Sequence, residues 1–210
     1  MRIPFLPIAL VLLGASAFAH GEDSPWYAQF SVGGVFSDTA ESVPGSPVDF
    51  DPGYEVSLAL GRHFPYSERF GLDVELEGYY QYFKVDEDDL PNISSAISDD
   101  DSALAWMLNG LFEWHFTPQF AFYGGGGAGY ATSAKYEAWD SGNLKQEDKE
   151  GFAYQGKAGF TYDLGGNYDL LLGYRYFRIE PLDIQNQVTG ETDQIDIGQH
   201  VVEVAFRWGL

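Results

Sequence analysis

The chain has 210 residues, no cysteine and a net charge of −21. This length suits one domain with a sizeable core, and the lack of cysteine excludes disulfides, thiolate metal sites and a cysteine nucleophile. The acidic composition argues against nucleic acid as a partner, because phosphate binding needs basic residues, and the 17% of aromatic residues argue against a disordered acidic tail.

The first 19 residues have the pattern of a secretory signal peptide. Arg2 precedes an apolar run from Ile3 to Leu13, and Ala17-Phe18-Ala19 supplies the small residues of a cleavage site. A membrane anchor is the alternative, but the run is shorter than the roughly 20 residues that a spanning helix needs. We predict a signal peptide at 1–19 and a barrel domain at 20–210, where no apolar stretch is long enough for a transmembrane helix.

From Trp26 onward, apolar and polar residues alternate in segments of strand length. We expect eight strands, at Trp26–Phe36, Tyr54–His63, Phe70–Phe83, Leu104–His115, Phe120–Ala131, Phe152–Asp163, Tyr168–Ile179 and Val201–Leu210. The connections after the second, fourth and sixth strands are short and rich in turn residues, and the others are long and polar. This regular alternation predicts an all-β fold, an antiparallel up-and-down transmembrane β-barrel with eight strands. An extra hairpin in the second or fourth long loop would make ten.

The two faces of each strand differ in character. In the third strand Asp73, Glu75 and Glu77 share one face, whereas leucine, valine and tyrosine residues share the other. Because bulky rings would overfill an eight-stranded lumen, we expect the apolar face to point outward. Its aromatic residues then form two girdles, one near the short turns (Trp26, Phe70, Trp114, Phe120, Tyr162, Tyr168 and Trp208) and one near the long loops (Phe36, Tyr54, Tyr80, Tyr82, Trp106, Tyr130, Tyr154 and Tyr176).

With these features the chain resembles the small outer-membrane β-barrel family of OmpA/OmpX-like barrels and porin-family surface proteins. The resemblance covers Trp26 to Leu210 and includes the last strand, Val202–Leu210, which is similar to the family's assembly signal. Family members usually end in an aromatic residue, so Leu210 is a departure. The resemblance implies the outer membrane of a Gram-negative bacterium, with periplasmic termini. It also implies outer-membrane lipid, lipopolysaccharide and the barrel assembly machinery as partners, the last through the C-terminal strand.

Charged residues on the inward face form a predicted lumen network. Its members are Glu55, Asp73, Glu75, Glu77, Glu113, Lys157, Arg175, Glu203 and Arg207. Buried charges must be paired or hydrated. We expect salt bridges that fill the lumen, since eight strands leave no wide channel. The alternative is a narrow ion path, which the excess of inward acids would make cation-preferring.

Acidic residues are concentrated in the long loops, which hold 21 of the 32. The second loop contains seven weak candidates for binding divalent cations that could bridge to lipopolysaccharide phosphates: Asp86, Glu87, Asp88, Asp89, Asp99, Asp100 and Asp101. Solvated, mutually repelling loops are the alternative. The ligand order of an EF-hand is missing, so the sequence predicts no calcium specificity.

One glycine-rich segment, Gly124 to Gly129, matches the spacing of a dinucleotide-binding loop. It lies inside a predicted strand with no helix after it, so we expect no nucleotide there and no other cofactor. Glycines at this place let a barrel strand bend and leave room inside for neighbours such as Tyr123.

Some outer-membrane barrels that modify lipid A carry a lipid-facing triad of Ser, His and Glu. The four histidines here are His20, His63, His115 and His200, and none begins the His-x-Ser arrangement of the deacylase group. Only His200 lies near the long-loop rim, and it has no serine close by in sequence. We therefore expect no enzyme but a barrel with a structural, adhesion or surface-interaction role. A cation channel, and less so a lipid A-modifying enzyme, are the alternatives.

Overall fold

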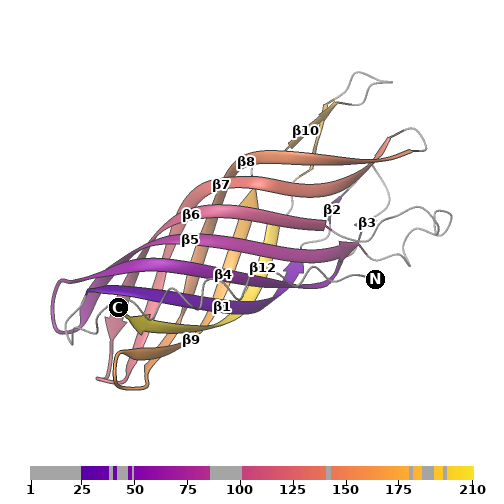
Figure 1. Ribbon diagram of the computed structural model, residues 1–210. Helices are drawn as coiled ribbons and strands as arrows, with labels where there is room; N and C mark the ends of the chain where they lie inside the picture. Colours follow the sequence, from indigo (N-terminus) through magenta and orange to yellow (C-terminus); the bar gives the residue numbers. More distant parts are fainter. Residues whose placement is uncertain are drawn as a thin grey trace.

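The chain forms a closed antiparallel β-barrel in the computed structural model (Figure 1). The structure describes residues 25–37, 40–41, 47–48, 50–85, 101–140, 143–179, 182–185, 192–195 and 198–210. Eight strands build the barrel: β1 (Trp26–Ser37), β4 (Phe50–Pro65), β5 (Phe70–Val85), β6 (Asp101–His115), β7 (Phe120–Asp140), β8 (Asn143–Asp163), β9 (Tyr168–Ile179) and β12 (Gly198–Gly209). Each pairs with its neighbour along the chain, and β12 closes the barrel onto β1. The eight-stranded up-and-down barrel is confirmed.

The predicted signal peptide at 1–19 lies outside the described residues. Within the described part of the chain, no helix is long and apolar enough to cross a membrane.

The hairpin of β7 and β8 extends well beyond the predicted strand ends. Pairing passes an irregularity after Ala131 and continues with Ala134–Asp140 against Asn143–Lys149. The predicted fifth strand therefore ended too early, at Ala131, and the predicted sixth strand began too late, at Phe152. The extension has charged and polar residues in both alternating sets, so it lacks the apolar face by which a half-buried strand is recognised in a sequence.

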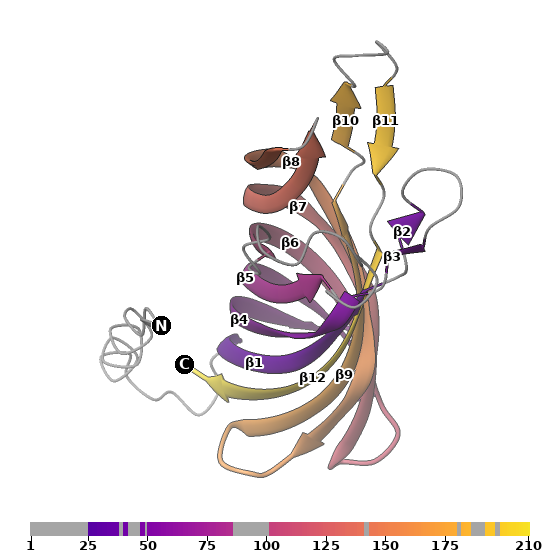
Figure 2. The same ribbon diagram turned by 90° about the vertical axis from the view of Figure 1, so that its right-hand side faces the viewer.

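Two smaller hairpins lie at the long-loop end of the barrel (Figure 2). They are formed by β2 (Ala40–Glu41) with β3 (Pro47–Val48), and by β10 (Leu182–Gln185) with β11 (Thr192–Ile195). The second of them lies in the fourth long loop, where an additional hairpin was considered. Its strands pair with each other and not with the barrel, so the barrel keeps eight strands.

The three short connections lie together at the end of the barrel that also holds the C-terminus (Figure 1). Two of them use the same local device: the hydroxyls of Ser67 and Thr117 accept hydrogen bonds from backbone N–H groups two and three residues further along. The connection after β8 instead contains Gly165, Gly166 and Asn167, all with positive φ. Glycine and asparagine tolerate this conformation best, which explains their presence in this turn.

The outer face carries the aromatic residues expected of two girdles. At the short-turn end all are exposed except Trp208, which is partly exposed, and at the long-loop end all are exposed except Tyr82 and Tyr176. Ring contacts join neighbouring strands, with centroids 6.2 Å apart for Phe70 and Trp114 and 4.7 Å apart for Phe120 and Tyr162. These rings form an apolar outer surface at each end of the barrel wall.

Four bulky rings lie buried in the lumen, where the size argument left little room for rings: Tyr27, Tyr79, Tyr123 and Phe177. Of these, Tyr123 was expected there. Glycines on facing strands provide the space. A Cβ added at Gly159 or Gly173 would collide with the hydroxyl of Tyr123. The room for Tyr123 thus comes from β8 and β9 and not from the glycine-rich segment of β7, where Gly125 instead lies against the backbone of β6.

Candidate functional site

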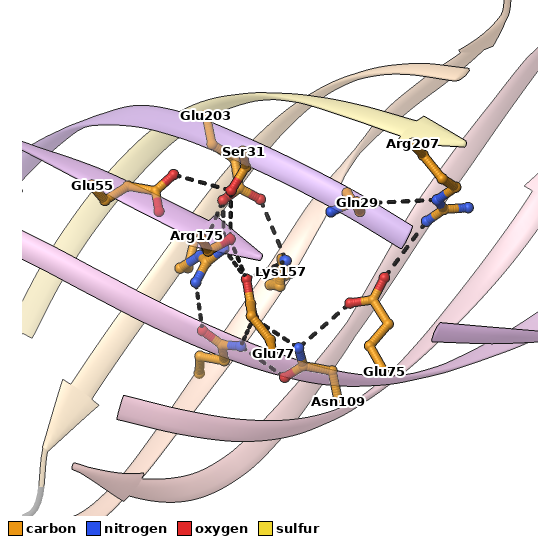
Figure 3. Close-up of polar contacts among 12 residues, drawn as sticks. Gln29, Ser31, Glu55, Glu75, Glu77, Asn109, Lys157, Arg175, Glu203 and Arg207 are labelled. Carbon is orange, nitrogen blue, oxygen red and sulfur yellow. Dashed lines mark hydrogen bonds and ion pairs between the residues drawn. The ribbon is translucent and has the colours of Figure 1, made fainter. Parts of the chain in front are cut away.

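The charged lumen is the candidate site, and strand alternation determines which residues enter it. The inward side chains have odd numbers on every barrel strand, including all nine residues of the predicted network. Their exposed fractions lie between 0% and 5%, so these charges are buried within the barrel. Two groups can be distinguished by depth, and Figure 3 shows the first of them together with Glu75 and Arg207 of the second.

The first group, here called the central cluster, consists of Glu55, Glu77, Lys157, Arg175 and Glu203. Arg175 donates from Nη2 to Glu77 Oε1 and to Glu203 Oε2, at 2.6 Å in each case. Its guanidinium carbon also lies 4.4 Å from the centre of the Tyr79 ring. Lys157 Nζ lies 3.4 Å from Glu77 Oε1 and 3.6 Å from Glu203 Oε1. The two cations therefore share two carboxylates, which is how buried charges are compensated.

Glu77 is the hub of this cluster. Besides the two cations, it accepts hydrogen bonds from Ser57 Oγ, Asn109 Nδ2 and Gln155 Nε2, all at 2.8 Å. Glu55 is joined to it indirectly, because Ser31 Oγ lies 3.4 Å from Glu55 Oε1 and 2.6 Å from Ser57 Oγ. Five donors on one carboxylate satisfy its acceptor capacity.

The second group, here called the mouth cluster, lies nearer the short turns and consists of Asp73, Glu75, Glu113 and Arg207 with the two histidines described below. Arg207 Nη1 lies 3.1 Å from Asp73 Oδ2 and 3.2 Å from Glu113 Oε2. Arg207 Nη2 is 3.7 Å from Glu75 Oε1, which accepts a hydrogen bond from the Tyr27 hydroxyl. The guanidinium again lies over a ring, 4.2 Å from the centre of Tyr27.

Each outer carboxylate of the mouth cluster also contacts an imidazole. His63 Nδ1 lies 2.6 Å from Asp73 Oδ1, and His115 Nε2 lies 2.6 Å from Glu113 Oε1. A chain of contacts thus runs from His63 through Arg207 to His115. The carboxylates of Asp73, Glu75 and Glu113 lie within 4 Å of one arginine, so these three charges are matched in number only when both imidazoles carry a proton.

Asn109 joins the two clusters. Its Nδ2 donates to Glu77 Oε2 and lies 3.5 Å from Glu75 Oε2, while its Oδ1 accepts from Gln155 Nε2 at 2.7 Å. Neutral partners such as Asn109, Gln155 and Ser57 were missed in the sequence. The signal that could have found them is their odd numbering, because they share the inward face with the charged residues.

Apolar side chains complete the filling of the lumen. One buried group is formed by Tyr79, Ala103, Ala105, Met107, Ala131, Ala153, Phe177 and Ile179, and a second by Leu111, Tyr123, Leu171 and Ala205. The first group lies on the long-loop side of the central cluster. Its members follow the cluster residues on β5 and β9, which run toward the long loops, and precede them on β8, which runs toward the short turns. The lumen around these residues is therefore packed like a core.

The acidic residues of the second long loop, predicted as candidates for cation binding, lie mostly outside the described part of the chain. Asp86, Glu87, Asp88, Asp89, Asp99 and Asp100 lie outside the described residues, and Asp101 begins β6. Among the described residues, no group of three or more His, Asp or Glu could hold a metal ion. Cation binding by these loops therefore stays a prediction.

His200 lies near the long-loop rim on the outer face. Its Nδ1 is 2.5 Å from the Tyr174 hydroxyl, and its ring centre is 5.2 Å from that of Tyr176. The arrangement therefore joins an imidazole to tyrosines on the lipid-facing side.

Comparison with known proteins agrees with this architecture. A family model described as "Outer membrane protein beta-barrel domain" matches residues 5–207. The chain belongs to this family. As an outer-membrane barrel protein, it is located in the outer membrane of a Gram-negative bacterium. No curated protein matches the chain by sequence.

The chain is similar to several solved structures at low sequence identity. Neisserial surface protein A is 15% identical with a TM-score of 0.58, and the match covers 89% of this chain and 98% of that one. Ail, the attachment invasion locus protein of Yersinia pestis, is 14% identical with a TM-score of 0.45, over 87% and 99% of the two chains. The N-terminal β-barrel domain of Pseudomonas aeruginosa OprF is 11% identical with a TM-score of 0.43, over 88% and 98%.

Proposed function

We propose that this outer-membrane barrel is a closed scaffold that presents its long loops as an interaction surface, in a structural or adhesive role. The observation that carries the proposal is the buried network around Glu77 and Arg175, which fills the middle of the lumen. A filled lumen is a stable core for the barrel, and it leaves the loops as the part that meets other molecules.

The long-loop end supports this role. The hairpin of β7 and β8 continues the barrel wall, with Ala134–Asp140 paired to Asn143–Lys149. The long loops also contain 21 of the 32 acidic residues of the chain. Acidic loops on a paired β-framework suit a partner with positive charge, including divalent cations bound near lipopolysaccharide phosphates. The name of the similar Neisserial protein, a surface protein, agrees with such a role.

The orientation follows from the same asymmetry. In our proposal the short turns and both termini of the mature chain face the periplasm, after removal of residues 1–19, and the acidic loops face outward. The C-terminal strand, β12, closes the barrel against β1 and is the segment offered to the barrel assembly machinery.

Adhesion of whole cells tests the proposal. Cells that display the protein are compared with cells that display a variant in which Asp86, Glu87, Asp88, Asp89, Asp99, Asp100 and Asp101 are changed to Asn or Gln. We expect wild-type cells to bind polylysine-coated beads, to lose that binding as salt shortens the Debye length to a few ångströms, and to bind several-fold better than the variant. A gel comparing boiled and unboiled samples shows that both barrels are folded. Equal binding by the two strains would contradict the proposal.

A further inference from the structure

Arg62 lies near the end of β4, close to the short turns, and its side chain points outward from the barrel. It is paired across the sheet with Trp26 on β1 and Val74 on β5, and its side chain is exposed. Trp26 belongs to the aromatic girdle at this end, so Arg62 is a cation at the depth of that girdle. A charge on the lipid-facing side of a membrane barrel is costly unless it reaches the interface or a partner of opposite charge.

Two aromatic rings hold the guanidinium in place. Its central carbon lies 5.4 Å from the centre of the Trp26 ring and 4.9 Å from that of Phe64. Rings against the face of a guanidinium attract its charge and restrict its rotation, while its N–H edge stays available for hydrogen bonds. Arg62 is therefore an ordered donor at the surface.

Comparison with the lumen shows what Arg62 lacks. Arg175 and Arg207 also lie over tyrosine rings, and each contacts carboxylates from other strands. Arg62 has the same ring support, but no carboxylate of the described residues pairs with it. In a chain with 32 acidic and 11 basic residues, an arginine that contacts no carboxylate of the described strands and turns is available to an anion from outside.

The position identifies that anion. Aromatic girdles lie at the level of the lipid headgroups, where the common anion is the phosphate of a glycerophospholipid. The paired N–H groups of arginine match two phosphate oxygens, a geometry that lysine does not offer. We propose that Arg62, supported by Trp26 and Phe64, binds the phosphate of a glycerophospholipid in the leaflet at the short-turn end. That leaflet is the periplasmic one if the orientation proposed above holds, but the binding itself does not depend on the loops.

Lipid retention by the folded barrel in detergent tests this site. Native mass spectrometry measures how much phosphatidylglycerol must be added before one lipid stays bound to the wild type, to Arg62→Gln and to Arg62→Lys. Arg69→Gln is the matched control, because Arg69 lies in the adjoining turn and is exposed without a ring contact among the described residues. We expect Arg62→Gln to need about tenfold more lipid than wild type, Arg62→Lys to lie between them, and Arg69→Gln to equal wild type.

Three results would overturn the inference. One is equal retention by wild type and Arg62→Gln, which would mean that interfacial water satisfies Arg62. Another is an equal loss in Arg69→Gln, which would indicate a diffuse charge effect. The third is displacement of the lipid by inorganic phosphate as readily as by unlabelled phosphatidylglycerol, which would make this a site for free phosphate. Each can occur whether or not the acidic loops mediate adhesion, so the two proposals fail separately.

Discussion

The central cluster and the mouth cluster place the same kinds of side chain at two depths of one lumen, and they differ in their access to solvent. Arg175 in the central cluster is fully buried below an apolar layer that contains Tyr79 and Phe177. The mouth cluster ends in His63 and His115, whose side chains are 33% and 36% exposed. The deep cluster must balance its charges through fixed contacts, whereas the shallow one can also exchange protons with water.

Removal of the central cation should produce the largest effect. Arg175→Met leaves Glu77 and Glu203 without their 2.6 Å partner in a buried setting, and we expect the free energy of unfolding to fall by about 3–5 kcal/mol. Urea unfolding of the barrel refolded in lipid vesicles measures this change. Adding Glu77→Leu should recover part of the loss, because it removes one uncompensated charge. A double variant less stable than the single one would contradict the account.

The equivalent change in the mouth cluster should lower the free energy of unfolding by less. Arg207→Met removes the cation between Asp73 and Glu113, but each of these carboxylates keeps an imidazole partner that is partly exposed to water. We expect a loss of about 1–3 kcal/mol in the same urea experiment. If Arg207→Met proves more damaging than Arg175→Met, depth does not control the strength of the two clusters.

The pH dependence should come from the mouth and not from the centre. Protonated His63 and His115 stabilise the folded state through their contacts with Asp73 and Glu113. The other charged groups nearby are Glu75, Arg207 and, for His115, Asp169. The stabilisation is present at low pH and is lost as pH rises and the imidazoles lose their protons. From about pH 5 to about 8 we expect the unfolding free energy to fall by roughly 0.2–1 kcal/mol per pair, since both pairs are partly exposed.

The double variant His63→Gln, His115→Gln isolates this effect. Its unfolding free energy should vary less over the same pH interval than that of the wild type, whereas Arg175→Met should keep the wild-type slope. An unchanged slope in the histidine variant would remove the mouth cluster as the source of the pH dependence.

Much of this arrangement was accessible from the sequence because a strand alternates its two faces. The odd-numbered acids of β5 and the basic residues of β8, β9 and β12 could be assigned to the lumen from that rule alone. Their partners could not be assigned. Glu77 and Arg175 are 98 residues apart and meet only because the sheet closes with one particular register.

Other features were missed for equally physical reasons. The space that admits Tyr123 comes from Gly159 and Gly173 on other strands, and not from the glycines that follow Tyr123 on β7, to which the sequence pointed. The end of β7 was placed too early and the start of β8 too late, because pairing beyond the apolar wall leaves no hydrophobic alternation to detect.

The central claim is that the lumen is a packed core. Planar-bilayer recording tests it most directly, with protein shown to be folded by its different gel migration before and after boiling. The account predicts no steady conductance from the wild-type barrel at neutral pH, because the nine charged side chains are buried among their partners. A steady, cation-preferring current from folded wild-type protein would contradict it and favour the narrow ion path.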